Sequence, residues 1–213
     1  MGILKERFKA KAEAASAEIK QLLKDNGSKV IGEVQLSQIY QGMRGMTGLV
    51  TETSLLDAQE GIRFRGYSIP DLRESLPKFK NGTEPMPEGL FYLMLIGELP
   101  SKEDVEHITS VWQRRSHVPG HVFDTIDALP LHTHPMTMFV TGVMALQTES
   151  FFQKAYAKGL NKKDYWDATY EDAMNLIACL PQVAAYIYRR TYKGNVHIAP
   201  DDSLDWASNY AHM

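Results

Sequence analysis

Residues 173–188 read AMNLIACLPQVAAYIY and contain no charged side chain. A second stretch, MTMFVTGVMAL at residues 136–146, is also uncharged. We predict that these stretches lie in two helices, which span residues 163–192 and 136–152. Helices that are apolar nearly all round are buried inside a large protein or between subunits. A chain of 213 residues is too short to surround two of them, which indicates an oligomer or further sequence.

Further helices are predicted around these two, at residues 3–25, 68–76, 87–96, 101–115 and 119–128. Ser101 and Asp104 have the spacing of a capping box, in which two side chains satisfy backbone N–H groups at the start of a helix. Asn161 is the expected N-cap of the 163–192 helix, and Pro181 inside that helix predicts a kink. The pattern is that of a mainly α-helical protein.

Short β structure is predicted near the N-terminus. Alternating chemistry over residues 29–40 favours a short strand followed by a turn. Two extended pieces, Leu49–Thr53 and Gly61–Tyr67, flank a turn and predict a small β-hairpin near residues 49–67. Between the strand and the hairpin, Gly42–Gly48 is too rich in glycine to be regular structure throughout.

The composition limits the classes of partner. A formal net charge of -3 argues against a nucleic-acid-binding surface, which needs a basic excess to replace counterions on phosphate. No apolar run approaches the roughly 20 residues that span a bilayer, so we expect no membrane partner. The single cysteine, Cys179, cannot form an internal disulfide. Its apolar helix predicts a buried structural thiol.

Residue patterns alone offer little chemistry. His132 and His134 lie two positions apart, point to opposite sides of an extended chain and have no third ligand nearby, so we predict no metal site. His134, which precedes Pro135, is expected to open a helix. Glu171 and Asp172 form an acidic pair without matching groups and are expected on a solvated face.

The loop Gly42–Gly48 is a weak nucleotide-binding motif, because it lacks the Gly-Lys-Ser/Thr ending of a phosphate loop. Arg44 lies between glycines, where the backbone can approach another surface closely. The alternative is a tight turn that carries a solvated arginine.

Several segments resemble a known family. They read YQGMRGMTGL at residues 40–49, EGIRFRGYSIP at 60–70 and EPMPEGLF at 84–91, followed by Leu131–Pro135, Ala155–Gly159 and Tyr170–Arg190. In this order and at this spacing they closely resemble the N-terminal half of eukaryotic mitochondrial-type citrate synthase. The resemblance covers essentially the whole chain.

The resemblance implies an incomplete multi-helical citrate synthase large domain, of which residues 1–213 are a part, with the small catalytic domain absent from this chain. The chain ends within what reads as a helix, before the family's catalytic half. The resemblance also implies a homodimer that packs helices 136–152 and 163–192 of both subunits, where small residues such as Gly142 allow close helix approach. The implied location is the mitochondrial matrix, with the peroxisome as the alternative.

The activity implied by the resemblance is that of an acyltransferase that forms a C–C bond. The family condenses acetyl-CoA with oxaloacetate and water to give citrate and CoA at the entry of the tricarboxylic acid cycle. Acetyl-CoA is a substrate, and no cofactor is implied. The family's catalytic residues lie in its C-terminal half, so no catalytic residue is assigned here and the chain alone is expected to be inactive.

Two CoA-binding residues are implied by the same resemblance. Arg44 matches an arginine near the CoA phosphates. Lys154 stands where many relatives have an arginine that reaches a CoA phosphate across the dimer, and lysine keeps the charge but loses the bidentate geometry. Two alternatives stay open: a non-catalytic helical paralogue that acts in dimerisation or as a scaffold, and a 2-methylcitrate synthase that uses propionyl-CoA.

Overall fold

The computed structural model describes residues 2–46, 48–80 and 82–213, and it is mainly helical with a small sheet, as predicted. Thr47 of the glycine-rich loop lies outside the described residues. Contacts between Cα atoms divide the chain into two compact units. The first runs to Leu76 and includes Leu90–Leu99; the second contains Pro77–Gly89 and Pro100–Met213. That residues 1–213 belong to one large domain stays a prediction.

The first unit combines helices with a three-stranded antiparallel sheet. Its elements are α1 (Ile3–Asn26), α2 (Leu36–Tyr40), β1 (Ser54–Asp57), β2 (Gly61–Phe64), β3 (Tyr67–Ser68) and α3 (Ile69–Ser75), with most of α4 (Pro87–Ile96). The strands pair in the order β1-β2-β3. Leu55 lies opposite Arg63, and Phe64 lies opposite Tyr67.

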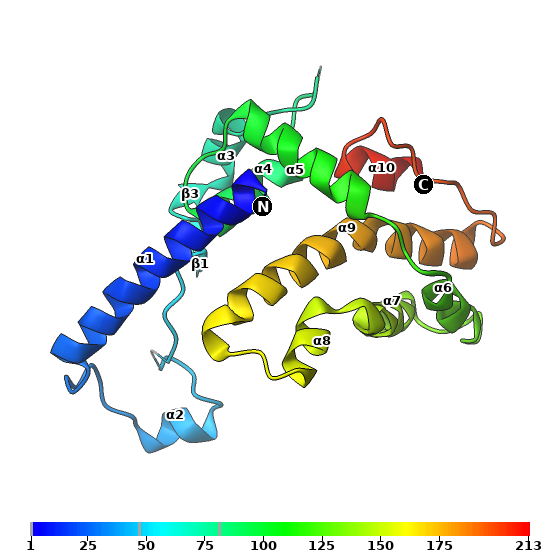
Figure 1. Ribbon diagram of the computed structural model, residues 1–213. Helices are drawn as coiled ribbons and strands as arrows, with labels where there is room; N and C mark the ends of the chain where they lie inside the picture. The colour runs from blue at the N-terminus through cyan, green and yellow to red at the C-terminus, as the bar shows by residue number, and fades with distance from the viewer. Residues whose placement is uncertain (1, 47, 81) are drawn as a thin grey trace. The chain divides into compact units, whose positions relative to one another are not determined.

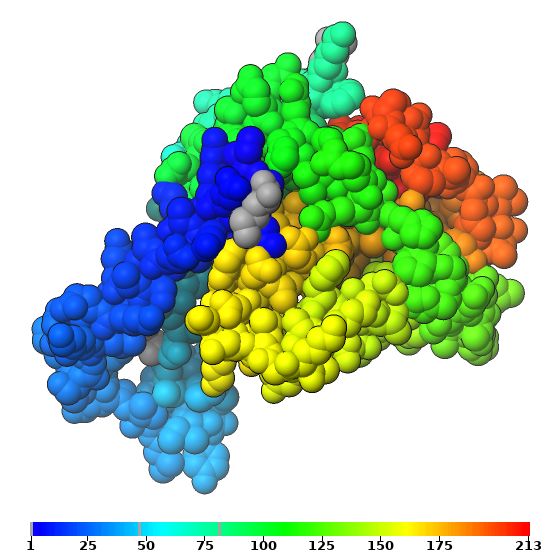
Figure 2. All heavy atoms as spheres, viewed as in Figure 1, coloured from blue at the N-terminus to red at the C-terminus, as the bar shows by residue number. Residues whose placement is uncertain are grey.

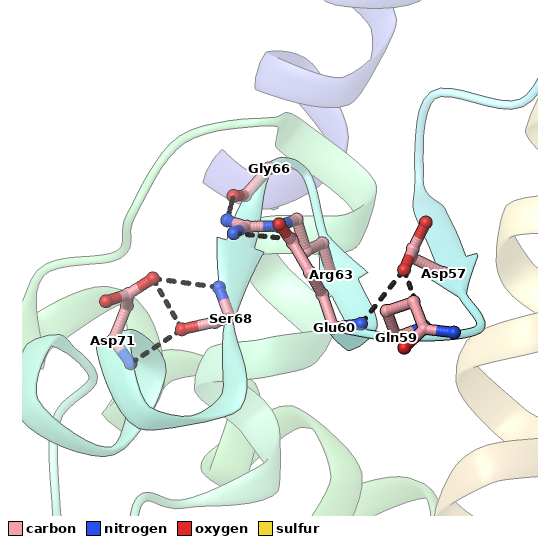
Figure 3. A network of polar contacts seen from close by, with 7 residues as sticks. All are labelled: Asp57, Gln59, Glu60, Arg63, Gly66, Ser68 and Asp71. Carbon is pink, nitrogen blue, oxygen red and sulfur yellow. Dashed lines mark hydrogen bonds and ion pairs between the residues drawn. The ribbon is translucent and has the colours of Figure 1, made fainter.

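Side-chain contacts fix the two turns of this sheet (Figure 3). Between β1 and β2, the carboxylate of Asp57 accepts hydrogen bonds from the backbone N–H groups of Glu60 (2.9 Å) and Gln59 (2.7 Å). Those bonds lower the pKa of Asp57 below its ordinary value, and the bond from Glu60 has the larger effect. Arg63 donates to Glu60 (2.9 Å) and to the carbonyl oxygen of Gly66 (3.0 Å), so it spans the second turn.

Ser68 and Asp71 then start α3 with a capping box, shown in Figure 3: each side chain bonds the backbone N–H of the other. The helix buries Leu72, and Leu76 follows it; both pack with Leu93 of α4 in a small core. Partly buried Phe64, Tyr67 and Leu90 complete this core.

Arg65 ties the sheet to the end of α4. Its backbone φ of 49° lies in the left-handed region, which few non-glycine residues adopt. Its guanidinium donates twice to the carbonyl oxygen of Met94, at 3.2 and 2.9 Å, and pairs with Glu52 at 3.4 Å. The last carbonyls of a helix have no intrahelical partner, and Arg65 supplies one for α4.

Two predictions for this unit are wrong. Residues 29–40 hold no strand: the chain is irregular up to Gln35, and α2 follows. Val30 is 87% exposed, which shows that the alternating side chains have no sheet to pack on. The first hairpin strand begins at Ser54, not at Leu49, because its ladder with β2 extends only as far as the pairing of Ser54 with Phe64.

The second unit is built around one long helix. Its helices are α5 (Lys102–Arg115), α6 (Gly120–Asp127), α7 (Pro135–Ala145), α8 (Phe151–Ala157), α9 (Tyr165–Tyr192) and α10 (Trp206–His212), with 3₁₀ turns at Leu146–Glu149 and Lys162–Asp164. All the other helices of this set contact α9. In Figure 1, α5 and α10 lie along one side of α9, and α7 and α8 along the other.

The core of the second unit lies where α6, α7 and α9 meet. Val122 and Ile126 of α6, Met138 of α7 and Val183 of α9 have no exposed surface. Gly142 of α7 faces the same core: a Cβ atom there would lie 3.0 Å from Ile126 Cδ1 and 3.1 Å from Val183 Cγ1. The close helix approach at Gly142 is therefore made with α6 and α9 of its own chain.

The helix predicted at 163–192 is confirmed. Asn161 caps the 3₁₀ turn before α9 by accepting from Lys163 N at 3.2 Å, and the helix continues through Pro181. The kink stays a prediction. A continuous helix over residues 136–152 is wrong, because α7 ends at Ala145 and the chain turns at Ser150. Serine is a preferred N-cap, and Ser150 starts a separate helix.

Within the described residues, no helix is both long and apolar enough to cross a membrane.

Candidate functional site

Helix α8 presents Lys154 at the surface. The ring of Phe152 faces inward, 5.0 Å from that of Tyr165 and 5.8 Å from that of Tyr156. Lys154 follows two residues later, about 200° further round the helix, and its side chain is 54% exposed. Glu149 Oε2 lies 3.9 Å from its Nζ atom. The ammonium group is thus open to an anion, beside the carboxylate of Glu149, which competes for it.

The beginning of α8 is bound to α9 through Asp172. Its carboxylate accepts hydrogen bonds from Ser150 Oγ (2.6 Å), Phe151 N (2.6 Å) and Phe152 N (3.0 Å). A helix start leaves its first N–H groups without intrahelical partners, and negative charge is favoured there. The prediction that Asp172 lies on a solvated face is wrong. Its role depends on a contact between distant segments, so no local pattern marks it.

Glu171, the other acid of the pair, is also held inside the unit. Its Oε2 atom accepts from Arg115 Nη1 at 2.7 Å, and the same nitrogen donates to Asn175 Oδ1 at 2.9 Å. The Glu171 side chain is 20% exposed. The expectation of a solvated face fails here as well, because α5 packs against this part of α9.

A groove of about 540 Å³ lies beside α9, bordered by α5, α7 and α8. Its walls are mostly apolar and include Val143, Leu146, Phe151, Leu176 and Cys179. Polar side chains, among them Arg115 and Asp172, also line it.

The cysteine of this groove is a structural thiol, as predicted. Cys179 is 5% exposed, and its single S–H faces the carbonyl oxygens of Arg115 (3.5 Å from Sγ) and His117 (3.4 Å), either of which can accept it. Burial raises its pKa to about 11. A thiol with so high a pKa is scarcely ionised at neutral pH and is a poor nucleophile.

An apolar stripe runs along α7 next to the groove. Met136, Val140 and Met144 are spaced by four residues and are 59%, 57% and 67% exposed. Figure 2 shows atoms of α7 and α8 at the surface of the second unit. Contiguous exposed apolar surface marks an interaction site more often than a solvated one.

Arg44 lies in the first unit, in the loop after α2, and is exposed. Met43 (φ 60°) and Gly45 (φ 73°) on either side of it adopt left-handed backbone. Met43 N donates to the carbonyl oxygen of Gln38 at 2.7 Å, which folds the loop back on α2. This tight turn presents the arginine outward. Lys154 belongs to the second unit, and the two residues are therefore not brought together within either unit.

The most deeply buried acid holds α10 in place. Glu88, at the start of α4, has no exposed surface, and its Oε1 atom accepts from Thr109 Oγ1 (3.2 Å) and Trp206 N (3.3 Å). Asp205 is 5% exposed and caps α10 by accepting from Ser208 N at 2.7 Å. Burial is the main cause that raises the pKa of Glu88, and the charge of Asp205 raises it further.

Glu88→Gln is expected to remove a pH dependence of stability. Because the folded pKa exceeds the ordinary value of 4.5, the folded state binds more protons than the unfolded state between these values. Stability therefore falls as pH rises through that window. Glutamine keeps an acceptor for Thr109 and Trp206 but does not ionise, so melting temperatures of the variant should fall less from pH 4.5 upward. Glu106→Gln, at an exposed acid, is the control and should follow the wild type.

His132 and His134 stand just before α7. His134 is the N-cap of α7 and accepts from Met136 N at 3.1 Å, so the prediction that it opens this helix is confirmed. His132 is exposed in the preceding turn. Across residues 2–46, 48–80 and 82–213, no three His, Cys, Asp or Glu side chains are grouped as a metal ion would require.

The fold defines a class: a multi-helical protein with a small antiparallel sheet in its first unit and one long helix at the centre of its second. Residues 42–213 match the family described as "Citrate synthase, C-terminal domain". The mitochondrial citrate synthase of Daucus carota is 56% identical over 195 residues, which are 92% of this chain and 41% of that protein. The mitochondrial 2-methylcitrate synthase of Yarrowia lipolytica is 50% identical over 211 residues, which are 99% and 45% of the two. The chain belongs to the citrate synthase family.

Solved structures agree on the fold. Citrate synthase from Pyrobaculum aerophilum matches with a TM-score of 0.68 at 24% identity, over 87% of this chain and 45% of that chain. Citrate synthase from Thermoplasma acidophilum, a ternary complex with carboxymethyl coenzyme A and oxaloacetate, matches with a TM-score of 0.60 at 21% identity, over 80% and 40%. The chain spans less than half the length of these relatives.

Proposed function

We propose that this chain is part of a citrate synthase, which condenses acetyl-CoA with oxaloacetate and water to give citrate and CoA and so feeds the tricarboxylic acid cycle. The observation that carries the proposal is the 56% identity with a mitochondrial citrate synthase over 92% of this chain. The ligands of the Thermoplasma acidophilum complex support the same substrate classes here.

The reaction requires a base for a proton next to a thioester carbonyl and donors for the developing enolate. The buried acids Glu88 and Asp205 bind the start of α10 instead, and the partly buried Asp172 binds the start of α8. We assign no catalytic residue to the chain and infer that it is inactive alone.

The test is thiol release from acetyl-CoA and oxaloacetate by the purified chain, with and without the C-terminal half of a relative. We expect no release by the chain alone and release when that half is supplied. Turnover by the chain alone would contradict the inference of inactivity. No thiol release in either case would favour the alternative of a non-catalytic helical paralogue.

A second candidate activity is 2-methylcitrate synthesis, which the 50% identity with the Yarrowia lipolytica enzyme over 99% of this chain favours. The two enzymes differ in the acyl-CoA that they accept. Propionyl-CoA offered in the same thiol-release assay separates them, and we expect acetyl-CoA to be the faster substrate.

The CoA-binding residues proposed are Arg44 and Lys154. Both are exposed, cationic and carried on short, well-anchored segments. Phosphate is bound by such groups through charge-assisted hydrogen bonds. We propose no metal and no cofactor besides the acyl-CoA substrate.

We propose a homodimer formed through α7 and α9, within the predicted ranges 136–152 and 163–192. The exposed stripe of Met136, Val140 and Met144 beside the apolar groove supports it. Sedimentation velocity tests it, since a monomer at micromolar concentration would contradict the proposal.

The names of the relatives support a mitochondrial location. The matrix is the compartment that we propose, with the peroxisome as the alternative, and fractionation of cells decides between them.

A further inference from the structure

We propose that Asp172 is a positioning residue for anion binding by Lys154. It would act by holding α8 in the one orientation that points the ammonium group outward. The proposal rests on the proposed function, in which Lys154 binds a phosphate of CoA. Asp172 itself is 18 positions away in sequence and would not touch the ligand.

Helix α8 is too short to be stable by itself. It has seven residues, and helices shorter than about 12 residues are marginal in water without tertiary contacts. Its orientation is therefore set by what it docks on. Contacts between α8 and α9 are extensive, and the polar ones described at its N-terminus converge on Asp172.

The contacts of Asp172 also set the orientation of α8. Asp172 binds Phe151 N and Phe152 N together with Ser150 Oγ, which fixes both the position of the first turn and its rotation. Ser150 in turn accepts from Gln153 N at 3.0 Å, so it links the carboxylate to the next turn. With the helix fixed in this way, Phe152 is turned into the aromatic cluster and Lys154 to the outside.

A through-space role and a positioning role of Asp172 change the affinity for an anion in opposite directions. Asp172 is an acid, and its loss would strengthen the binding of any anion if its charge acted only through space. If it acts by positioning, its loss weakens binding, because α8 then samples orientations that carry Lys154 away from the ligand. The two roles therefore predict opposite changes in affinity.

The experiment is a calorimetric titration of the full chain with CoA. It compares the wild type with Asp172→Ala, Asp172→Asn, Lys154→Ala and the double variant Asp172→Ala/Lys154→Ala. Asp124→Asn, at an exposed acid on α6, controls for the loss of one negative charge. Circular dichroism establishes that each variant is folded. Ser150→Ala removes only one of the three bonds and serves as the milder variant if Asp172→Ala does not fold.

We expect Lys154→Ala and Asp172→Ala each to weaken CoA binding about tenfold, as loss of one charge-assisted contact would. The double variant should be no weaker than Lys154→Ala alone, since Asp172 acts through Lys154. Ser150→Ala should be weakened less, and Asp124→Asn should bind as well as the wild type or better.

Unchanged or tighter binding by Asp172→Ala overturns the inference and leaves the proposed function intact. So does an equal loss from Asp172→Ala in the presence and absence of Lys154, because Asp172 then acts by another route. Unchanged binding by Lys154→Ala, or no binding of CoA by the wild type, overturns the assignment of Lys154 in the proposed function, and this inference falls with it.

Discussion

Replacing Arg190 by alanine is expected to lower the free energy of unfolding by about 3 kcal/mol. Arg190 of α9 is 7% exposed, and its Nε atom donates to Asp127 Oδ1 at 2.9 Å. Its Nη2 atom donates to the carbonyl oxygens of Leu129 (2.7 Å) and Asp127 (3.3 Å). These carbonyls lie at and just after the end of α6, so the guanidinium fastens this helix to α9.

The size of the loss follows from what is left behind. Removing one partner of a buried ion pair costs about 3–5 kcal/mol, because the other charge stays desolvated. The side chain of Asp127 is 44% exposed and keeps its bond from Tyr186 Oη at 2.6 Å. Water and Tyr186 can therefore satisfy the carboxylate, which places the loss at the lower end of that range. The two carbonyl oxygens lose their donor.

Urea denaturation followed by circular dichroism measures this loss. Arg190→Lys keeps the charge without the fork of donors, and it should lie between the wild type and the alanine variant. Arg189→Ala changes the next residue, which bonds the carbonyl oxygens of Val196 and Met213 in the chain after α9, and should cost less. A loss below about 1 kcal/mol for Arg190→Ala, the range of an exposed pair, would show that the attachment of α6 to α9 does not depend on this guanidinium.

Local signals placed the helices of this protein well. The capping box of Ser101 and Asp104 starts α5, and Pro87 starts α4, as predicted. Such signals are read from neighbouring residues, since the groups at a helix end are satisfied by side chains within one turn. The long helix up to Tyr192 was predictable from its uncharged stretch and from Asn161, which caps the 3₁₀ turn before it.

Contacts between distant segments were not predictable in this way. Val30 and Val34 alternate as in a strand, but strand formation needs a partner, and none pairs with them among the described residues. Asp172 looked like a solvated acid because its three donors, around Ser150, reach it only through the fold. The break at Ser150 was missed because the sequence after Leu146 still permits a helix.

In the candidate site, too, local motifs could be found from the sequence and contacts between distant residues could not. The motif around Arg44 and the lysine at 154 were found by resemblance to a family, and their part in CoA binding stays a prediction. The structure adds what the motifs do not contain: the anchor of α8 at Asp172, the competing carboxylate of Glu149, and the groove beside α9. The anchor and the groove bring together residues that are distant in sequence.

Gly142→Val is the second substitution for which we expect a large loss of stability, about 3 kcal/mol. A Cβ atom at this position already meets Ile126 Cδ1 at 3.0 Å and Val183 Cγ1 at 3.1 Å. Ile126 can move the end of its side chain, but the β-branched Val183 has little rotamer freedom in a helix. Both neighbours have no exposed surface, so the two further methyl groups of valine can be placed only by moving α7 away from α6 and α9.

Alanine at the same position separates packing from helix propensity. It gains about 1 kcal/mol over glycine in a helix interior and loses a similar amount through the two short contacts, so Gly142→Ala should stay within about 1 kcal/mol of the wild type. Thr137→Val introduces the same valine into α7 at an exposed position outside the stripe of Met136, Val140 and Met144, and it should cost only a few tenths of a kcal/mol. Urea denaturation of the three variants compares their free energies of unfolding. If Gly142→Val were as stable as Thr137→Val, the junction of α6, α7 and α9 would be loosely packed, and the glycine would not be needed for the close approach of these helices.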